Sequence, residues 1–292
     1  MIFVYIIIIL TSFFLLYHLV WYLRFKRSFV PILMYHRITD DEKPKDKRYL
    51  MHKGVILDLD TMKVKPAMFE KQMAYLKKKK YISKFLDNKT LEKDEKKVYI
   101  TFDDGYSDNY EYAFPILKKY GFTATFFLTA GLIEYKSFMS IDESDQREEN
   151  RLMNWWEVIE MAKWGMQLGS HTLFHPWLSD DSINLKQEII DSKIFIEEKT
   201  NFLVNVFAYP AGMYNDKTLE LVRDNYSCAV ITSRGRDFSI KNKDIYMIER
   251  ETISSKDSMF MFKLKICGIH KFLRKLSWVD LLKRVIRWIL KR

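Results

Sequence analysis

The chain has 292 residues, of which 48% are hydrophobic and 15% aromatic, a composition that excludes a disordered protein and suits one large domain. Its two cysteines, Cys228 and Cys267, are too few for a disulfide framework and cannot form a cysteine-based metal site. The net charge of +10 comes without an Arg/Gly-rich tract or a recognition-helix pattern, so we expect an anionic membrane surface rather than nucleic acid as a partner.

The amino-terminal residues 1–23 are predicted to form a transmembrane anchor. Residues 2–23 contain no Asp, Glu, Lys or Arg and are about as long as a helix needs to cross a bilayer. Tyr17, Trp21 and Tyr22 gather at the far end, where aromatic rings suit the membrane interface. A cleaved signal peptide is one alternative, but its basic n-region and its small-residue cleavage site are both absent. A buried core helix is the other, and an all-round apolar character at the extreme terminus counts against it.

Strands alternate with helices along the rest of the chain. Short apolar runs predict strands at residues 29–35, 98–102, 124–128, 166–170, 204–208 and 229–232. Apolar residues at helical spacing predict helices that start at Pro66 and that cover residues 110–121, 155–164, 183–198 and 218–223. This alternation implies an α/β fold with a parallel sheet, either open or closed into a barrel. In both arrangements the chemistry gathers at the carboxyl ends of the strands.

A long polar insert covers residues 134–154, between a predicted strand and the helix that follows it. Loops of this length are uncommon unless they are functional or disordered. The insert could therefore shape a substrate groove, or it could be a solvated excursion from the domain.

Two adjacent carboxylates, Asp103 and Asp104, follow the strand predicted at residues 98–102. Such a pair repels and is costly to bury unless it shares a cation or a proton. Successive strand residues point in opposite directions, so the two carboxylates can have different roles. A helix cap for the helix that begins near Ser107 is the structural alternative.

His171 and His175 follow the strand predicted at residues 166–170 and precede Pro176. Two histidines four positions apart lie on one face of a helical turn, where they can chelate one metal ion. Together with Asp104 they would form an open site of two nitrogens and one oxygen. Catalytic zinc sites have this character, because they leave room for water and substrate.

These motifs and a third one resemble those of the polysaccharide deacetylases, the NodB-homology domain of carbohydrate esterase family 4. The three are Thr101-Phe102-Asp103-Asp104-Gly105, His-Thr-x-x-His and Phe207-Ala208-Tyr209-Pro210-Ala211-Gly212. The ordered match runs from about Pro31 to about Arg250. It implies a distorted (β/α) barrel with fewer than eight strands, as a catalytic domain over residues 29–255. It also implies a hydrolase that removes N-acetyl groups from N-acetylhexosamine units of a cell-surface polysaccharide or its lipid-linked precursor.

The resemblance also assigns roles to residues. It makes Asp104, His171 and His175 the ligands of a divalent metal, for which zinc is the expected ion, and it makes Asp103 the general base. The backbone N–H of Ala211 would help to hold the oxyanion. In general terms, a metal ion polarises an acyl carbonyl, and a free carboxylate can remove a proton from the attacking water.

The resemblance leaves the general acid to be found. Many family members carry it in a Leu-x-His motif near the carboxyl end, but here Gly268 stands two places before His270. The Met34-Tyr35-His36 arrangement resembles the poly-N-acetylglucosamine deacetylase branch, in which the acid sits on the first strand. We therefore expect His36 to be the acid. The alternative is a histidine that merely forms a hydrogen bond in the mouth of the barrel.

The third motif departs from the family pattern. Ala208 occupies the place of an arginine that tethers the base in many members, and Ala211 replaces a frequent tyrosine. Arg250, or less favourably Arg236, could supply the missing charge, although either could equally form a surface ion pair. Three tryptophans flank the motifs and could stack on sugar rings or pack in the core: Trp155, Trp156 and Trp177.

The carboxyl-terminal residues 259–292 combine apolar residues at helical spacing with many basic ones. This pattern is typical of a helix in a membrane interface with anionic lipid, and a surface helix packed on the barrel is the alternative. With the anchor, it predicts a single-pass membrane protein that acts on an N-acetylated glycan. The charges after the anchor, Arg24, Lys26 and Arg27, favour a cytoplasmic domain, whereas the family implies an extracytoplasmic one.

Two other functions stay open at this point. The altered third motif would permit a catalytically silent carbohydrate-binding module on the same fold, although the intact Asp103, Asp104, His171 and His175 argue against it. An amidohydrolase that acts on another acylated substrate would use the same groups.

Overall fold

The computed structural model describes residues 29–274, except 42–48, 53–54, 91, 93–95, 144 and 233–243, and a few isolated positions before residue 29. Among these residues, no helix combines the length and the apolar character needed to cross a bilayer, for which about 20 apolar residues are required. The predicted single-pass membrane localisation is therefore wrong for the described part of the chain. The anchor predicted at residues 1–23 falls largely outside the described residues.

Seven parallel strands form a closed barrel, which confirms the predicted barrel with fewer than eight strands. In chain order they are β1 (Ile32–Tyr35), β7 (Lys97–Phe102), β8 (Thr125–Leu128), β9 (Gln167–Ser170), β10 (Val206–Ala208), β11 (Cys228–Thr232) and β12 (Ile248–Thr252). The barrel closes at β1, where Leu33 is in register with Ile100 of β7 on one side and with Glu251 of β12 on the other. The short strand β6 (Ile82–Ser83) pairs with the start of β7.

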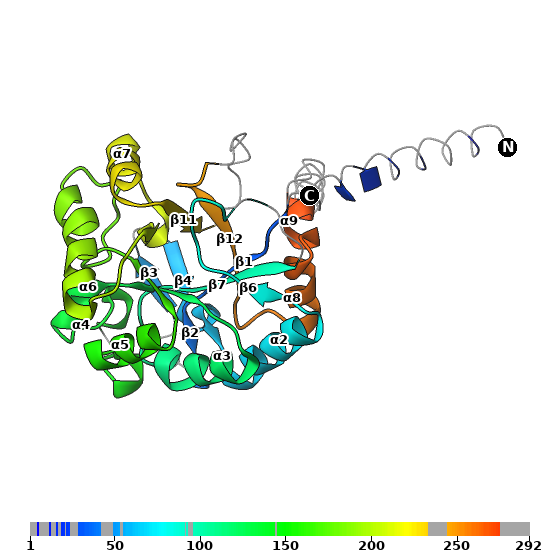
Figure 1. Cartoon of the computed structure of the whole chain (residues 1–292), viewed down its shortest axis with the longest axis horizontal. Coiled ribbons are helices and arrows are strands. Elements are labelled where there is room, and N and C mark those ends of the chain that lie inside the picture. The colour runs from blue at the N-terminus through cyan, green and yellow to red at the C-terminus, as the bar shows by residue number, and fades with distance from the viewer. Residues whose placement is uncertain are drawn as a thin grey trace, which may run out of the picture.

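Helices surround these strands (Figure 1). They are α2 (Pro66–Lys78), α3 (Phe114–Tyr120), α4 (Ala130–Glu134), α5 (Trp155–Lys163), α6 (Ser192–Thr200), α7 (Asp216–Asn225), α8 (Met259–Ile266) and α9 (Ile269–Arg274). Wider π-helical turns precede α3 and α6, at Asn109–Ala113 and Gln187–Asp191. Short 3-10 helices lie at Leu59–Met62, Ser140–Asp142, Glu148–Asn150 and Pro210–Gly212. Two small sheets complete the described fold, one of β2 (Arg37–Ile38) with β5 (Lys63–Val64) and one of β3 (Tyr49–His52) with β4 (Val55–Asp58).

Alternation along the strands divides the core into two clusters, because successive strand residues face opposite sides. One cluster takes its residues almost entirely from the barrel strands: Ile32, Leu86, Tyr99, Phe127, Val206, Ala208, Cys228, Val230 and Ile248. On the other face, Phe102 stacks on Phe126 with 4.8 Å between ring centroids and packs among the helices. Along β7, Tyr99 and Thr101 therefore share a face with Asp103, the residue that follows the strand.

The insert at residues 134–154 is built into the domain. Its backbone forms two short 3-10 helices, and Asp142, Asp145 and Asn150 are buried although they are polar. Buried polar groups are retained only where they find partners. The insert is therefore part of the folded body and not a solvated excursion.

The described part of the carboxyl-terminal segment packs on the barrel. Phe262 of α8 is fully buried, and its ring lies edge-on to Tyr75 of α2, 6.1 Å away between centroids. Lys265 is buried as well and donates to Asp257 at 2.6 Å. Gly268, with φ of +80°, separates α8 from α9. Residues 275–292 of the predicted tail lie outside the described residues.

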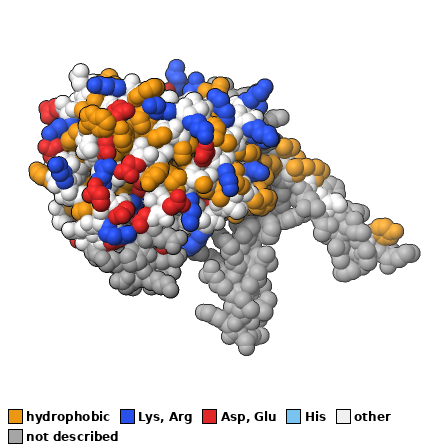
Figure 2. Space-filling view, turned by 90° about the horizontal axis from the view of Figure 1, so that it is seen from below, with side chains coloured by type: hydrophobic (Ala, Val, Ile, Leu, Met, Phe, Trp, Pro, Cys, Tyr) orange, Lys and Arg blue, Asp and Glu red, His pale blue; other side chains and the backbone are white. Residues whose placement is uncertain are grey.

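Charge of both signs is mixed on the surface. On the face shown in Figure 2, Lys and Arg side chains alternate with Asp and Glu side chains, and apolar side chains lie between them. Among the ion pairs of the protein, Lys119–Glu70 is exposed and Arg151–Glu111 is partly buried. The net charge of +10 therefore does not form one continuous basic patch on that face.

Cys228, the buried first residue of β11, offers a test of the barrel. Burial raises the pKa of its thiol to about 12, and the thiolate is the species that reacts with alkylating agents. In a Cys267→Ser variant, in which Cys228 is the remaining thiol, we expect iodoacetamide at pH 8 to label the protein only after unfolding in urea. Rapid labelling of the folded variant, followed by mass spectrometry, would contradict this placement of β11.

Candidate metal centre and active site

Four strand ends meet at one edge of the barrel. The predicted site residues directly follow these ends: His36 after β1, Asp103 and Asp104 after β7, His171 after β9 and Ala211 shortly after β10. Because the carboxyl ends of parallel barrel strands lie at the same edge, residues far apart in the chain meet there.

The structure brings together the three predicted metal ligands. The ligand atoms of Asp104, His171 and His175 all lie within 4.8 Å of one another. Asp104 Oδ1 is 3.5 Å from His171 Nε2 and 3.6 Å from His175 Nε2. His171 Nδ1 lies 2.7 Å from the carbonyl oxygen of Ala208, and a proton donated there leaves Nε2 free to bind an ion. One carboxylate oxygen and two imidazole nitrogens are a donor set that suits a divalent metal such as zinc.

The two histidines meet through a loop and not through the predicted helical turn. Thr172 and His175 both have positive φ, at 71° and 57°, a left-handed conformation that a continuing helix excludes. Hydrogen bonds hold this loop in place. The Glu188 carboxylate accepts from the N–H groups of Leu173 and Phe174, at 2.9 and 3.1 Å, and Thr172 Oγ1 accepts from the N–H of His175 at 2.9 Å.

Asp104 itself has a left-handed backbone, with φ of 76°. Such a conformation is costly for a residue other than glycine and persists only where its surroundings hold it. Thr129 Oγ1 donates to the Asp104 carbonyl at 2.7 Å. The turn separates the directions of the two adjacent carboxylates, so that Asp104 meets the histidines while Asp103 lies elsewhere.

Asp103 forms a two-pronged ion pair with Arg250 of β12. Arg250 Nη1 donates to Asp103 Oδ1 at 2.6 Å and Nη2 donates to Oδ2 at 2.7 Å. Nη1 also donates to Thr101 Oγ1 at 3.0 Å, and the guanidinium lies over the ring of Phe127. Both partners are fully buried. Arg250 thus supplies a positive charge beside Asp103 from another strand, whereas the third motif has Ala208 and no arginine.

The charges of the site oppose the effect of burial. Burial alone would raise the pKa of the Asp103 carboxyl, but the Arg250 guanidinium lowers it, and the net shift is downward. The pKa of Asp104 is likewise raised by burial, but His171 and the other nearby histidines lower it well below its usual range. Burial and the neighbouring His171 lower the pKa of His175 to about 4. His175 is thus neutral near pH 7, as a metal ligand must be.

His36 lies close enough to act on both carboxylates. A charge on its ring would lower the pKa of Asp103 and of Asp104. Its Nδ1 atom is buried and has no hydrogen-bond partner within the described part of the chain. By contrast, His270 lies on α9, where Nδ1 pairs with Glu251 at 2.8 Å.

The remaining residues that the sequence analysis singled out lie in different places. Ala211 lies in the turn after β10 with φ of 51°, and Arg236 lies outside the described residues. Trp155 donates to Glu134 at 2.8 Å. Trp156 is 66% exposed and lies edge-on to Tyr110, and Trp177 is half-buried.

Three features of the site escaped the sequence analysis. Glu188 holds the histidine loop from fifteen positions away, and no local sequence pattern predicts this contact. Tyr135 and Phe174, the residue before His175 in the chain, form an exposed pair of nearly parallel rings with 6.1 Å between centroids. Phe174 stands inside the histidine motif, which could have drawn attention to it. Arg37, next to His36, is buried in a polar cluster.

Comparisons with known proteins agree with this geometry. The sequence profile of a family described as polysaccharide deacetylase matches residues 90–226. YxkH of Bacillus subtilis, which its name assigns to the polysaccharide deacetylases, is 29% identical over 237 residues, or 78% of this chain and 73% of that protein. The poly-beta-1,6-N-acetyl-D-glucosamine N-deacetylase of Staphylococcus aureus is 25% identical over 215 residues, or 69% of this chain and 71% of that protein. The Streptococcus pyogenes deacetylase PplD, solved in complex with acetate, aligns with 81% of this chain and 97% of its own, with a TM-score of 0.63 and 27% identity.

The Arg250–Asp103 pair should be important for stability. Replacing Arg250 by Met leaves a buried carboxylate without its partner, so we expect the free energy of unfolding to fall by about 3 kcal/mol or more in urea titrations. The matched control is Arg223→Met, which removes the half-exposed partner of Asp244 and should change stability by less than about 1 kcal/mol. Equal losses of stability in the two variants would show that burial does not increase the contribution of the Arg250–Asp103 pair.

Proposed function

We propose, since this chain belongs to the polysaccharide deacetylase family, that it hydrolyses the N-acetyl groups of N-acetylglucosamine units in a β-1,6-linked cell-surface polysaccharide. The observation that carries this proposal is the division of the adjacent carboxylates between two sets of partners. Asp104 joins two histidines in a set of metal-binding groups, whereas Asp103 lies against an arginine. Such a division provides one group for a metal ion and one for a proton.

Two relatives support the substrate class. The Staphylococcus aureus relative is by name an N-deacetylase of poly-beta-1,6-N-acetyl-D-glucosamine, and PplD was solved with acetate, which is the acid released by deacetylation. The position of His36 at the end of β1 is also the one expected for an acid in that branch. The exposed rings of Tyr135 and Phe174 offer flat apolar faces of the kind that pack against sugars.

The side chains divide the reaction among themselves. Asp103, kept ionised by Arg250, accepts the proton of the attacking water. His36 donates a proton to the departing amine of the sugar. The backbone N–H of Ala211, after β10, helps to hold the oxygen of the tetrahedral intermediate. When bound by Asp104, His171 and His175, a divalent ion, for which we propose zinc, supplies a Lewis acid for the acetamide carbonyl.

The function is tested by acetate release from β-1,6-linked N-acetylglucosamine oligomers. We expect the zinc-loaded protein to release acetate, and we expect a chelator to abolish the release and added zinc to restore it, because the ion is held by three side chains in an open site. Chitooligosaccharides and a peptidoglycan fragment serve as comparison substrates for the linkage. Absence of acetate from every glycan with zinc-loaded protein would refute the proposed function.

Asp103→Asn and Asp104→Asn form a matched pair of variants. Both should lower kcat by about a hundredfold or more, since each removes one of the two carboxylate functions. They should differ in metal content. Asp103→Asn should bind zinc as the unaltered protein does, whereas Asp104→Asn should bind it more weakly in a calorimetric titration. Full activity in Asp103→Asn would exclude Asp103 as the base.

A further inference from the structure

No described residue orients the ring of His36 through its Nδ1 atom. Nδ1 is buried without a hydrogen bond to any described residue, whereas a catalytic histidine is commonly held through its second nitrogen. The backbone of this segment is held instead. The carbonyl of His36 accepts from Asn109 Nδ2 at 2.9 Å, and the carbonyl of Tyr35 accepts from the N–H of Asp103 at 3.0 Å. The position of His36 therefore depends on its main chain.

Asp108 connects the residues that hold the backbone around His36. Its Oδ1 accepts from the N–H of Ile38 at 2.9 Å and from Asn109 Nδ2 at 2.9 Å, the same amide that holds the carbonyl of His36. Its Oδ2 accepts from Arg37 Nε at 2.7 Å. The Asp108 carboxylate thus orients both the Asn109 amide, which binds the carbonyl of His36, and the N–H of Ile38, two residues after His36.

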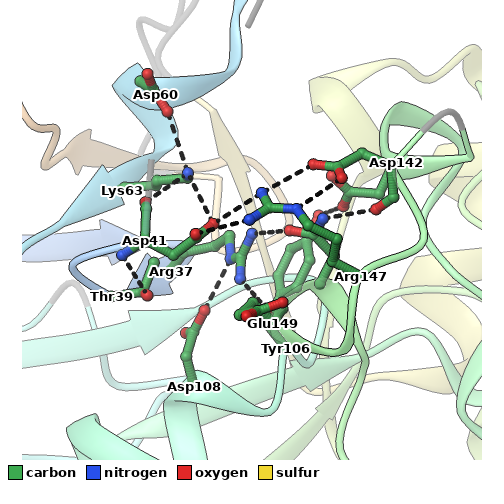
Figure 3. Close-up of polar contacts among 12 residues, drawn as sticks. Arg37, Thr39, Asp41, Asp60, Lys63, Tyr106, Asp108, Asp142, Arg147 and Glu149 are labelled. Carbon is green, nitrogen blue, oxygen red and sulfur yellow. Dashed lines mark hydrogen bonds and ion pairs between the residues drawn. The ribbon is translucent and has the colours of Figure 1, made fainter. Parts of the chain in front are cut away.

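Arg37 is in turn held from three directions (Figure 3). Besides Asp108, its guanidinium donates to Asn150 Oδ1 at 2.6 Å and to the carbonyl of Glu149, and it lies 4.5 Å from the ring centroid of Tyr106. Arg37, Asp108 and Asn150 are all buried. Directional hydrogen bonds in a buried site restrict side-chain geometry more strongly than exposed ones do. The cluster is therefore a rigid support.

The support also connects the two halves of the proposed acid–base pair. Tyr106 and Asp108 belong to the segment that follows Asp103 and Asp104, and Arg37 follows His36 directly. A small displacement of this segment would change the distance between acid and base, and displacements of about 1 Å can slow a reaction by up to about a hundredfold.

We propose that Arg37 is a positioning residue for His36, acting through Asp108 and Asn109. This inference rests on the proposed function, because the role of His36 as the acid belongs to it. Arg37 itself does not touch the substrate.

A double-mutant comparison tests the inference, with acetate release from β-1,6-linked N-acetylglucosamine oligomers as the measurement. Arg37→Lys keeps the positive charge but loses the forked geometry, so kcat should fall about tenfold while KM and zinc binding change by less than about twofold. In a His36→Ala background, Arg37→Lys should cause no further loss, because a residue that acts through His36 has nothing left to position. A purely structural role would lower kcat in both backgrounds.

Asn109→Ala gives a second test that leaves the buried ion pair intact. It removes the donor to the carbonyl of His36 and should reproduce the fall in kcat, again without a further effect in the His36→Ala background. The matched control is Arg147→Lys, a neighbouring arginine whose side chain binds Asp41 and Asp145 instead of Asp108 or Asn109, and its kcat should stay within about twofold of the unaltered value.

The outcomes separate the inference from the function on which it rests. If the unaltered protein releases acetate and both Arg37→Lys and Asn109→Ala keep its kcat, Arg37 does not position His36. A fall in kcat that persists in the His36→Ala background, or an equal fall in Arg147→Lys, also overturns the inference. If the unaltered zinc-loaded protein releases no acetate from any glycan, the proposed function fails and the inference fails with it.

Discussion

Two adjacent carboxylates buried at one strand end cannot both stay ionised unless each has its own positive or proton-donating partner. This constraint determines the arrangement around Asp103 and Asp104. Strand alternation and the left-handed turn at Asp104 point the two side chains apart. Asp103 then meets a guanidinium contributed by β12, and Asp104 meets two imidazoles contributed by the loop after β9. Each partner comes from a different strand, so the site can form only when the barrel is closed.

The parts of this arrangement that depend on residue type and strand position were predictable from the sequence. Apolar runs located six of the seven barrel strands to within a few residues, all except β12, and the motifs after them contained the carboxylates and histidines that the structure brings together. The geometry between them was not predictable. The spacing of His171 and His175 suggested a helical turn, but the loop turns through left-handed residues that Glu188 holds from a distance. Hydrogen bonds over such distances leave no periodic signal in the sequence.

The polar cluster around Arg37 was even less predictable from the sequence. Its partners lie 71 and 113 positions away, and in the sequence each looks like an ordinary surface residue of a polar segment. Only burial makes them informative, because a buried charge needs a partner where an exposed one does not. The membrane prediction erred for the opposite reason. Apolar and basic patterns were interpreted as interfacial, whereas in the described part of the carboxyl-terminal segment Phe262 packs against Tyr75 of α2.

The closure of the barrel has a consequence for synthesis of the chain. Asp103 and Arg250 are separated by 147 positions, and β1 completes its pairing only when β12 arrives. A ribosome that has extended the chain beyond β7 but not yet to β12 therefore holds an incomplete barrel with an unpaired strand edge, in which Asp103 still lacks Arg250. Exposed strand edges invite association with other chains. Until β12 is synthesised, the Asp103 carboxylate lacks its buried partner, so the incomplete barrel is the form of the chain most open to association with other chains.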